Sequence, residues 1–270
     1  MIQRNGATIE RAVLMLSGRK VTIWTGGVGP ALLLLHSAWG DAEMSWQPVW
    51  NELARSFTVI APDLPGFGAS DPLVAPSLAA NARLLRELLD SRNVDRAIVA
   101  GNSFGAAVAI EFATSFPDRT QNLVLVNGGF LPALPGFMRK LLRLRYAEKK
   151  IRSLMRKMTY SDKAFAKAFP DPEKLPPGIF ERIRRNEESQ ARTVFNTFMN
   201  QTAPQRTPAV PVAFIWGTGD RLTSMKQAGL VRTWPSAPKL VPLNGAGHMP
   251  QLEQPKEFVE ALKIGSGSRA

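Results

Sequence analysis

The sequence predicts an α/β fold: eight strands form a doubly wound, mostly parallel sheet, and a helical segment is inserted after the sixth strand. Two observations predict it. Short apolar runs alternate with amphipathic helical patterns along most of the chain, which is typical of a parallel sheet covered by helices on both faces. That alternation stops between Pro132 and Pro211, where helical, basic and proline-rich sequence replaces the strand-like runs.

The strands are expected at the short apolar runs, and the first two form a hairpin through Ser17, Gly18 and Arg19. The expected strands span residues 12–17, 20–25, 31–36, 57–62, 94–100, 121–126, 211–217 and 238–244. The helices that cover them are expected at residues 78–91, 103–115, 224–233 and 255–263. Pro255 opens the last helix, where the N–H that proline lacks has no intrahelical partner to lose.

Residues 131–206 are predicted to form a helical cap over the carboxyl end of the sheet, which leaves residues 1–130 and 207–270 as the core. The first cap helix is expected at about 137–158. Residues 139–157 hold nine Lys or Arg and one acidic residue. The apolar face of this helix carries Leu141, Leu144, Ile151, Leu154, Met155 and Met158.

A basic amphipathic helix can lie on an anionic membrane surface, or its apolar face can roof a pocket. We favour the roof, because a cap over the sheet buries that face without a partner. The chain carries a formal net charge of +12, of which the cap holds about +10. The nearly neutral remainder argues against a general nucleic-acid-binding surface.

The residue composition excludes several kinds of site. The absence of cysteine excludes disulfides, thiolate nucleophiles and zinc–thiolate sites. Neither a signal peptide nor an apolar run long enough to cross a bilayer stands in the sequence, so we expect a cytoplasmic protein. The spacing of candidate ligands suggests no metal or organic cofactor, and the oligomeric state is left open.

The most informative motif is the pentapeptide at residues 101–105, Gly-Asn-Ser-Phe-Gly. It follows the strand-like run 94–100 and precedes the helical run 106–113. At such a strand-to-helix turn the backbone is so tight that only glycine fits beside the serine, whose hydroxyl is left exposed at the carboxyl edge of the sheet. Ser103 is therefore the predicted nucleophile.

A serine hydroxyl needs an adjacent base to act as a nucleophile near neutral pH. The chain has two histidines, and His248 lies in a glycine-rich loop after the last strand, from which it can reach Ser103. His248 is the predicted base, whereas His36 at a strand end is expected to be structural. Asp220, just after the penultimate strand, is the predicted carboxylate that orients the base.

The order Ser, Asp, His along the chain agrees with this assignment. A rival position for the acid follows the sixth strand, but Asn127 and two glycines stand there instead of a carboxylate. Attack on a carbonyl builds negative charge on oxygen, which needs fixed hydrogen-bond donors. The predicted oxyanion hole consists of the backbone N–H groups of Phe104 and Ala38.

These motifs together resemble the α/β-hydrolases, in particular the large bacterial group of esterases and carbon–carbon bond hydrolases. The resemblance runs over about residues 31–260 and rests on the segments 35–40 (Leu-His-Ser-Ala-Trp-Gly), 62–70 (Pro-Asp-Leu-Pro-Gly-Phe-Gly-Ala-Ser), 101–105, 216–220 (Trp-Gly-Thr-Gly-Asp) and 247–248 (Gly-His). The family usually has glycine at the position of Ser37, whose hydroxyl either adds a donor or holds the loop. The resemblance implies a structural role for Asp63, and Trp39 and Phe104 are expected to wall the pocket.

Three functions remain open. The first is a serine hydrolase that cleaves a small-molecule carboxylic ester. The second is a carbon–carbon bond hydrolase of ring-cleavage products, whose dianionic substrates need basic contacts inside the site. The third is a ligand receptor on a hydrolase scaffold with slow turnover. Dehalogenases and epoxide hydrolases of the same fold resemble the chain less, because they have Asp at the position of Ser103.

Overall fold

The computed structural model describes residues 8–129, 136–137, 145–201, 203, 205–223, 234 and 238–267. Eight strands form one sheet in the order β1-β2-β4-β3-β5-β6-β7-β8. They are β1 Glu10–Leu16, β2 Arg19–Gly26, β3 Ala31–Leu35, β4 Thr58–Pro62, β5 Ala97–Asn102, β6 Thr120–Val126, β7 Val212–Gly217 and β8 Lys239–Leu243. Each lies where an apolar run predicts a strand.

The sheet is mostly parallel. β1 and β2 form the expected antiparallel hairpin, and β2 is also antiparallel to β4. All other neighbouring pairs are parallel. This arrangement confirms the predicted fold class. The carboxyl ends of the parallel strands meet at one edge of the sheet, which is where functional loops gather in such folds.

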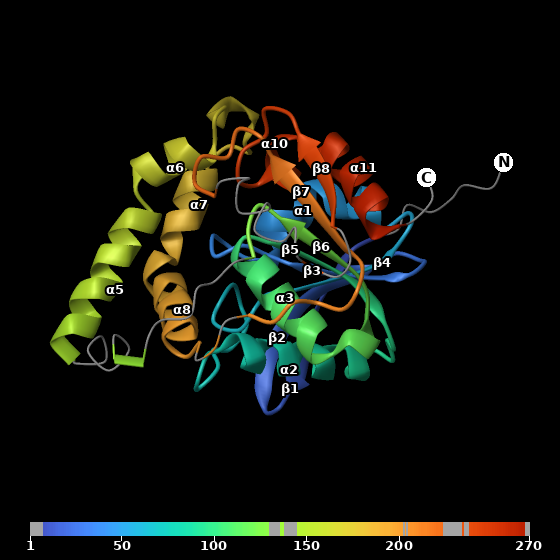
Figure 1. The fold of residues 1–270 in the computed structure, drawn as a ribbon, viewed down its shortest axis with the longest axis horizontal. Coiled ribbons are helices and arrows are strands. Elements are labelled where there is room, and N and C mark those ends of the chain that lie inside the picture. The colour runs from blue at the N-terminus through green and yellow to red at the C-terminus, as the bar shows by residue number, and fades with distance from the viewer. Residues whose placement is uncertain are drawn as a thin grey trace.

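Helices cover both faces of the sheet (Figure 1). One face packs against α2 (Leu78–Ser91) and α3 (Phe104–Ser115), and the other against α1 (Ala42–Leu53) and α11 (Pro255–Ser266). The expected helices at 78–91, 103–115 and 255–263 are confirmed, and the one at 224–233 lies outside the described residues. A short helix, α10 (Pro250–Glu253), precedes α11, and a 3-10 turn, η1 (Pro117–Arg119), precedes β6.

The sequence pattern did not predict α1, because Pro48 inside it signals a helix break. A proline in a helix costs about 3 kcal/mol or more. Here Asp41 caps the helix, its Oδ1 accepting the Met44 N–H at 2.7 Å. Trp46 and Leu53 are fully buried against the sheet. Capping and burial offset the loss at Pro48, which lies on the exposed side of the helix.

Within the described residues, four helices stand between β6 and β7, in the region predicted as the cap. They are α5 (Arg145–Thr159), α6 (Asp162–Ala168), α7 (Ile179–Arg185) and α8 (Glu187–Met199), with a 3-10 turn, η2 (Pro172–Lys174), after α6. An apolar cluster joins α6, α7 and α8 to the core. Its core members are Trp39, Met44, Met249 and Leu252, and its cap members include Tyr160, Phe165, Phe169, Leu175, Ile179 and Ile183. The boundaries at residues 131 and 206 stay a prediction.

The expected burial of the apolar face of the first cap helix is wrong for two of its residues. Leu154 is 56% exposed and Met158 is 65% exposed. In Figure 1, α5 lies at the outer margin of the molecule and α8 lies between it and the sheet. Ile151 and Met155, which share that face, are half-buried. Leu141 and Leu144 lie outside the described residues.

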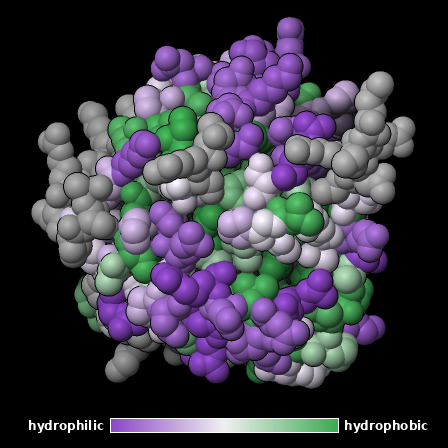
Figure 2. Space-filling view, turned by 90° about the vertical axis from the view of Figure 1, so that its right-hand side faces the viewer, coloured by the Kyte–Doolittle hydropathy of each residue, from purple (hydrophilic) through white to green (hydrophobic). Residues whose placement is uncertain are grey.

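Figure 2 views the molecule from the right-hand side of Figure 1, opposite to α5. On that face hydrophilic residues predominate in the upper and lower parts, with apolar residues scattered between them.

None of the helices in the described ranges is long and apolar enough to span a bilayer.

Candidate active site

Ser103 stands at the strained turn between β5 and α3, with φ 53° and ψ −110°. A Cβ atom at Gly101 would lie 2.3 Å from the Gly105 carbonyl oxygen, and one at Gly105 would lie 2.2 Å from the Leu35 carbonyl oxygen. Both positions therefore require glycine. A non-glycine residue in such a conformation costs on the order of 1–3 kcal/mol, and such strain clusters at functional sites.

His248 and Asp220 form a buried pair on two loops after β8 and β7. The His248 Nδ1 atom lies 2.8 Å from Asp220 Oδ2, and the residues are 2% and 7% exposed. Asp220 Oδ1 accepts the backbone N–H groups of Leu222 at 2.8 Å and Thr223 at 3.0 Å. These bonds fix the orientation of the carboxylate. Its other oxygen faces the imidazole.

The surroundings of Asp220 favour its charged form. Burial alone raises the pKa of the carboxyl group, but the charge of His248 and hydrogen bonds from His248, Thr223 and Asn127 outweigh it. The net result is a pKa of Asp220 below its ordinary value. The carboxylate is thus ionised near neutral pH and can hold the Nδ1–H of His248.

Asn127, which in the sequence only marks the absence of a carboxylate after the sixth strand, contacts the carboxylate of Asp220. It is fully buried, and its Nδ2 donates to Asp220 Oδ2 at 2.7 Å. Its Oδ1 accepts the Gly217 N–H at 3.1 Å, and its Nδ2 lies 3.2 Å from the Gly247 carbonyl oxygen. One amide therefore ties the end of β7 and the histidine loop to the carboxylate.

Glu253 is a second buried group for which the sequence pattern gives no signal. Its Oε2 accepts the Gly247 N–H at 2.8 Å and its Oε1 accepts the Met249 N–H at 3.2 Å. The carboxyl group thus holds the backbone on both sides of His248. Burial raises the pKa of Glu253 to about 7, although the two backbone bonds and the charge of His248 oppose this.

The raised pKa of Glu253 predicts a pH-dependent stability. Between its ordinary pKa of 4.5 and about 7 the folded chain keeps a proton that the unfolded chain releases, so the free energy of unfolding falls as pH rises through this window. Glu253→Gln, which is uncharged at every pH, removes that fall. We expect the variant to gain up to about 3 kcal/mol relative to wild type between about pH 5 and about pH 8.

Denaturant unfolding at the two pH values measures this gain. Glu257→Gln, on an exposed position of α11, is the matched control. In this variant the free energy of unfolding should depend on pH as it does in wild type. An equal pH slope in wild type and Glu253→Gln would show that Glu253 does not titrate in this range.

His36 holds the loop after β3 rather than a reacting group. It is fully buried, its Nε2 accepts the Leu64 N–H at 2.9 Å, and its Nδ1 lies 2.7 Å from the Ser37 carbonyl oxygen. The Nε2 contact assigns the proton to Nδ1, which donates to that carbonyl. Burial lowers the pKa of His36 and keeps the ring neutral.

The bond from His36 also orients the predicted oxyanion donor. In a trans peptide unit the carbonyl and the following N–H point in opposite directions. Holding the Ser37 carbonyl therefore fixes the direction of the Ala38 N–H. The Ser37 hydroxyl accepts the Trp39 N–H at 3.1 Å, so of its two possible roles the structure favours holding the loop.

The aromatic residues predicted to wall the pocket are both buried. Trp39 is 2% exposed and meets the His248 ring edge-on, with 5.5 Å between centroids. Phe104 packs against Phe67, at 5.7 Å. Their contact with substrate stays a prediction. Asp63 shapes the turn after β4, where its carboxylate oxygens accept the N–H groups of Ala42 and Ala69, each at 3.0 Å.

Comparison with known proteins agrees with this geometry. A sequence model of the alpha/beta hydrolase family matches residues 32–261. The chain belongs to the alpha/beta hydrolase family. The resemblance seen in the sequence motifs is thereby confirmed.

Two curated hydrolases are similar to this chain along most of their length. The 2-hydroxy-6-oxononadienedioate/2-hydroxy-6-oxononatrienedioate hydrolase 1 of Dechloromonas aromatica is 30% identical over 263 residues, covering 90% of this chain and 85% of the relative. The 2-hydroxy-6-oxo-6-phenylhexa-2,4-dienoate hydrolase of Burkholderia cepacia is 29% identical over 240 residues, covering 85% and 78%. A solved structure of a thermophilic esterase from Thermogutta terrifontis superposes with a TM-score of 0.76 at 22% identity, covering 94% of this chain and 97% of the esterase.

The cap helices of this alpha/beta hydrolase hold the loop that carries Ala38. The Tyr160 hydroxyl lies 3.2 Å from the Ala38 carbonyl oxygen and 3.3 Å from Gln190 Oε1. Gln190 Nε2 donates to the Gly40 carbonyl oxygen at 3.1 Å. Both side chains are buried. The sequence pattern gave no signal for this pair, since its two members lie thirty positions apart in different parts of the cap.

The cap also contacts the loops that carry His248 and Asp220. The carbonyl oxygen of Ala168, at the end of α6, accepts the His248 N–H at 2.7 Å. The preceding carbonyl, of Lys167, accepts the Arg221 N–H at 2.8 Å next to Asp220. All three loops therefore contact α6 or the Tyr160–Gln190 pair. Within the described ranges, no group of three His, Cys, Asp or Glu side chains gathers as metal ligands.

Proposed function

We propose that this hydrolase cleaves carboxylic esters through an acyl-enzyme intermediate on Ser103. The observation that carries the proposal is the buried His248–Asp220 pair, with 2.8 Å between Nδ1 and Oδ2, in a fold that places Ser103 at a strained strand-to-helix turn. Nucleophile, base and orienting carboxylate are the three parts that serine-dependent acyl transfer needs.

In the proposed reaction, Ser103 Oγ attacks the ester carbonyl carbon while its proton passes to Nε2 of His248. Asp220 holds Nδ1–H and stabilises the imidazolium. The N–H groups of Ala38 and Phe104 receive the carbonyl oxygen as it becomes negative. Phe104 is the first residue of α3, so its N–H has no partner within the helix.

The tetrahedral intermediate then collapses, and the C–O bond to the alcohol breaks as His248 returns the proton to the leaving oxygen. Water, deprotonated by His248, attacks the acyl-enzyme. The second collapse releases the acid and restores the Ser103 hydroxyl. No cofactor enters this scheme.

Carbon–carbon bond hydrolysis is the second candidate, and the two curated relatives, named as hydrolases of dienoate and dienedioate compounds, favour it. Such acids require free basic groups in the site. Several cap arginines are instead committed to carboxylates of the chain itself. Arg182 pairs with Asp41 and Glu43, and Arg184 pairs with Asp162. This commitment is the reason to place ester cleavage first.

A panel of chromogenic esters with graded acyl chains, run beside a ring-cleavage product, separates the two reactions. We expect multiple turnovers with at least one ester. A preference for the ring-cleavage product would reverse the order of the candidates. A single-turnover adduct with every ester would favour a ligand receptor on a hydrolase scaffold.

Tyr160→Phe tests the cap contact with the oxyanion loop. Losing a hydrogen bond worth about 0.5–1.5 kcal/mol should lower kcat by about two- to tenfold, because the loop then holds the Ala38 N–H less firmly. KM should change little, since the hydroxyl acts through the loop. Steady-state kinetics measure both constants. Ser189→Ala, which removes an exposed hydroxyl on α8, is the control, and equal kcat values in the two variants would contradict the role of Tyr160.

A further inference from the structure

The basic residues of α5 differ in whether they are paired with carboxylates. Arg156 lies 2.6 Å from Glu188 and 3.7 Å from Glu187 of α8. Arg152 pairs with Glu148 on its own helix and with Glu188. The arginines therefore face the cap and serve intramolecular packing.

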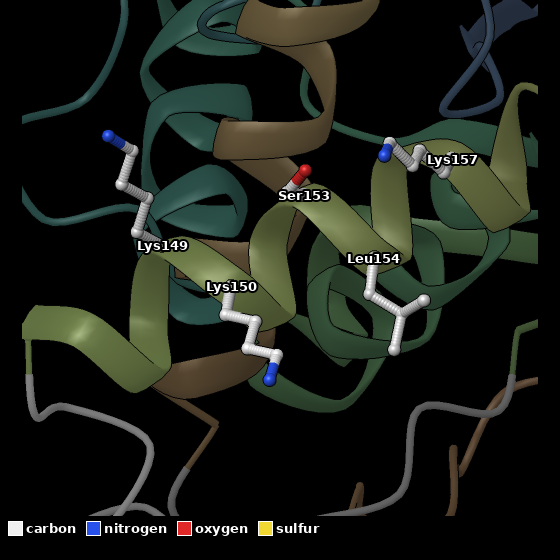
Figure 3. Close-up of a pocket in the computed structure, with 5 residues that line it drawn as sticks. All are labelled: Lys149, Lys150, Ser153, Leu154 and Lys157. Atoms are coloured by element: carbon white, nitrogen blue, oxygen red, sulfur yellow. The ribbon is translucent and has the colours of Figure 1, made fainter.

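The lysines extend farther around the helix: Lys149 borders the arginine side, and Lys150 and Lys157 lie beyond it. Lys149, Lys150 and Lys157, together with Ser153 and Leu154, line a surface hollow of about 530 Å³ (Figure 3). In Figure 3, Lys150 and Leu154 leave the helix on the same side, one turn apart. No carboxylate in the part of the chain that the structure describes forms an ion pair with these three lysines.

Large apolar side chains lie among these lysines. Leu154 is 56% exposed and Met158, one turn further along, is 65% exposed. We call the surface formed by Lys149, Lys150, Ser153, Leu154, Lys157 and Met158 the outer face of α5. A nucleic acid would match its charge but would leave the apolar residues in water, because phosphates and sugars cover the outside of a duplex. An anionic bilayer offers charge to the lysines and an acyl layer to Leu154 and Met158.

We propose that the outer face of α5 docks on an anionic membrane surface. The inference goes beyond ester cleavage and stands without it. None of the described helices could span a bilayer, so the contact is peripheral. Because α8 separates α5 from the sheet, the docked protein would face the membrane with the cap and keep the core in water (Figure 1).

Co-sedimentation of the full chain with vesicles tests the charge component. The vesicles contain phosphatidylcholine with or without phosphatidylglycerol. We expect salt-sensitive binding to the anionic vesicles alone. Lys150→Glu with Lys157→Glu should weaken this binding about tenfold or more, because each lysine near an anionic surface contributes on the order of a fivefold factor.

The matched control reverses two exposed lysines of the core, Lys239→Glu with Lys256→Glu, which changes the net charge equally. This control should bind within about twofold of wild type. Equal weakening by both pairs would show that net charge alone drives binding and would overturn the proposal. Thermal unfolding of each variant verifies that it is folded.

A second pair of variants tests the apolar component. Leu154→Ser with Met158→Ser should weaken binding severalfold even at salt concentrations that screen the lysines, because less apolar surface enters the acyl layer. Val28→Ser with Val74→Ser removes apolar side chains that are 71% and 88% exposed elsewhere, and should have no effect. Lysine-dependent binding to duplex DNA without binding to vesicles would make the outer face of α5 a nucleic-acid surface and refute membrane docking.

Discussion

Replacing Ser103 with alanine should lower ester hydrolysis on the order of 10³-fold or more. Without the hydroxyl no covalent intermediate can form, and only transition-state binding by the oxyanion donors remains. The fold should survive, because the backbone of Ser103 holds the turn: its N–H donates to the Val126 carbonyl oxygen, and its carbonyl accepts from Ala106 and Ala107.

Steady-state kinetics and covalent labelling check this expectation together. A fluorophosphonate should label wild type at Ser103 and leave the alanine variant unlabelled. Ser91→Ala, which removes a hydroxyl that bonds the Leu88 carbonyl at the end of α2, is the control and should keep both activity and labelling. Full activity in Ser103→Ala, or a label on another serine, would end the proposed mechanism.

Much of the fold follows from local signals. Each strand is a short apolar run bounded by turn residues, so its place depends on few distant contacts. The hairpin of β1 and β2 shows this, with Ser17 and Gly18 at positive φ. The helix α1 could not be predicted, because Pro48 is a local signal against a helix and only tertiary burial of Trp46 and Leu53 offsets it.

The orientation of α5 shows another limit of the sequence. Leu154, Met155 and Met158 have the same hydropathy pattern whichever side of the helix faces the protein. The contacts of Arg152 and Arg156 with glutamates of α8 turn Leu154 and Met158 outward. Those contacts join segments that lie far apart in the sequence, and helical periodicity carries no information about them.

The candidate site likewise contains residues that local sequence signals predict and residues that they do not. Ser103, Asp220 and His248 are recognisable because each follows a strand in a chain order that the fold repeats. Asn127 and Glu253 are recognisable only once their tertiary contacts are known. Asn127 stands where a carboxylate was sought, and its amide supports the carboxylate of another loop. Glu253 looks like an ordinary residue at a helix end until its contacts with the backbone beside His248 are known.

The second large effect is expected for Asp220→Asn, which should lower kcat on the order of 10²- to 10⁴-fold. The surroundings of the carboxylate determine how the new amide would lie. The backbone N–H groups of Leu222 and Thr223 donate to Oδ1, so only an oxygen can take that place. The amide NH₂ must then occupy the place of Oδ2, against His248 Nδ1 and the NH₂ group of Asn127.

An NH₂ group in that place reverses the hydrogen bond to the imidazole. His248 Nδ1 would accept a hydrogen bond instead of donating one, so Nε2 would carry the ring hydrogen and could not take the proton of Ser103. The loss should therefore fall on kcat with little change in KM. Asp63→Asn is the control: it alters a buried carboxylate that also accepts two backbone N–H groups, and it should lower stability without this selective loss of kcat. A near wild-type kcat in Asp220→Asn would show that another group orients His248, and the proposed role of Asp220 would then be wrong.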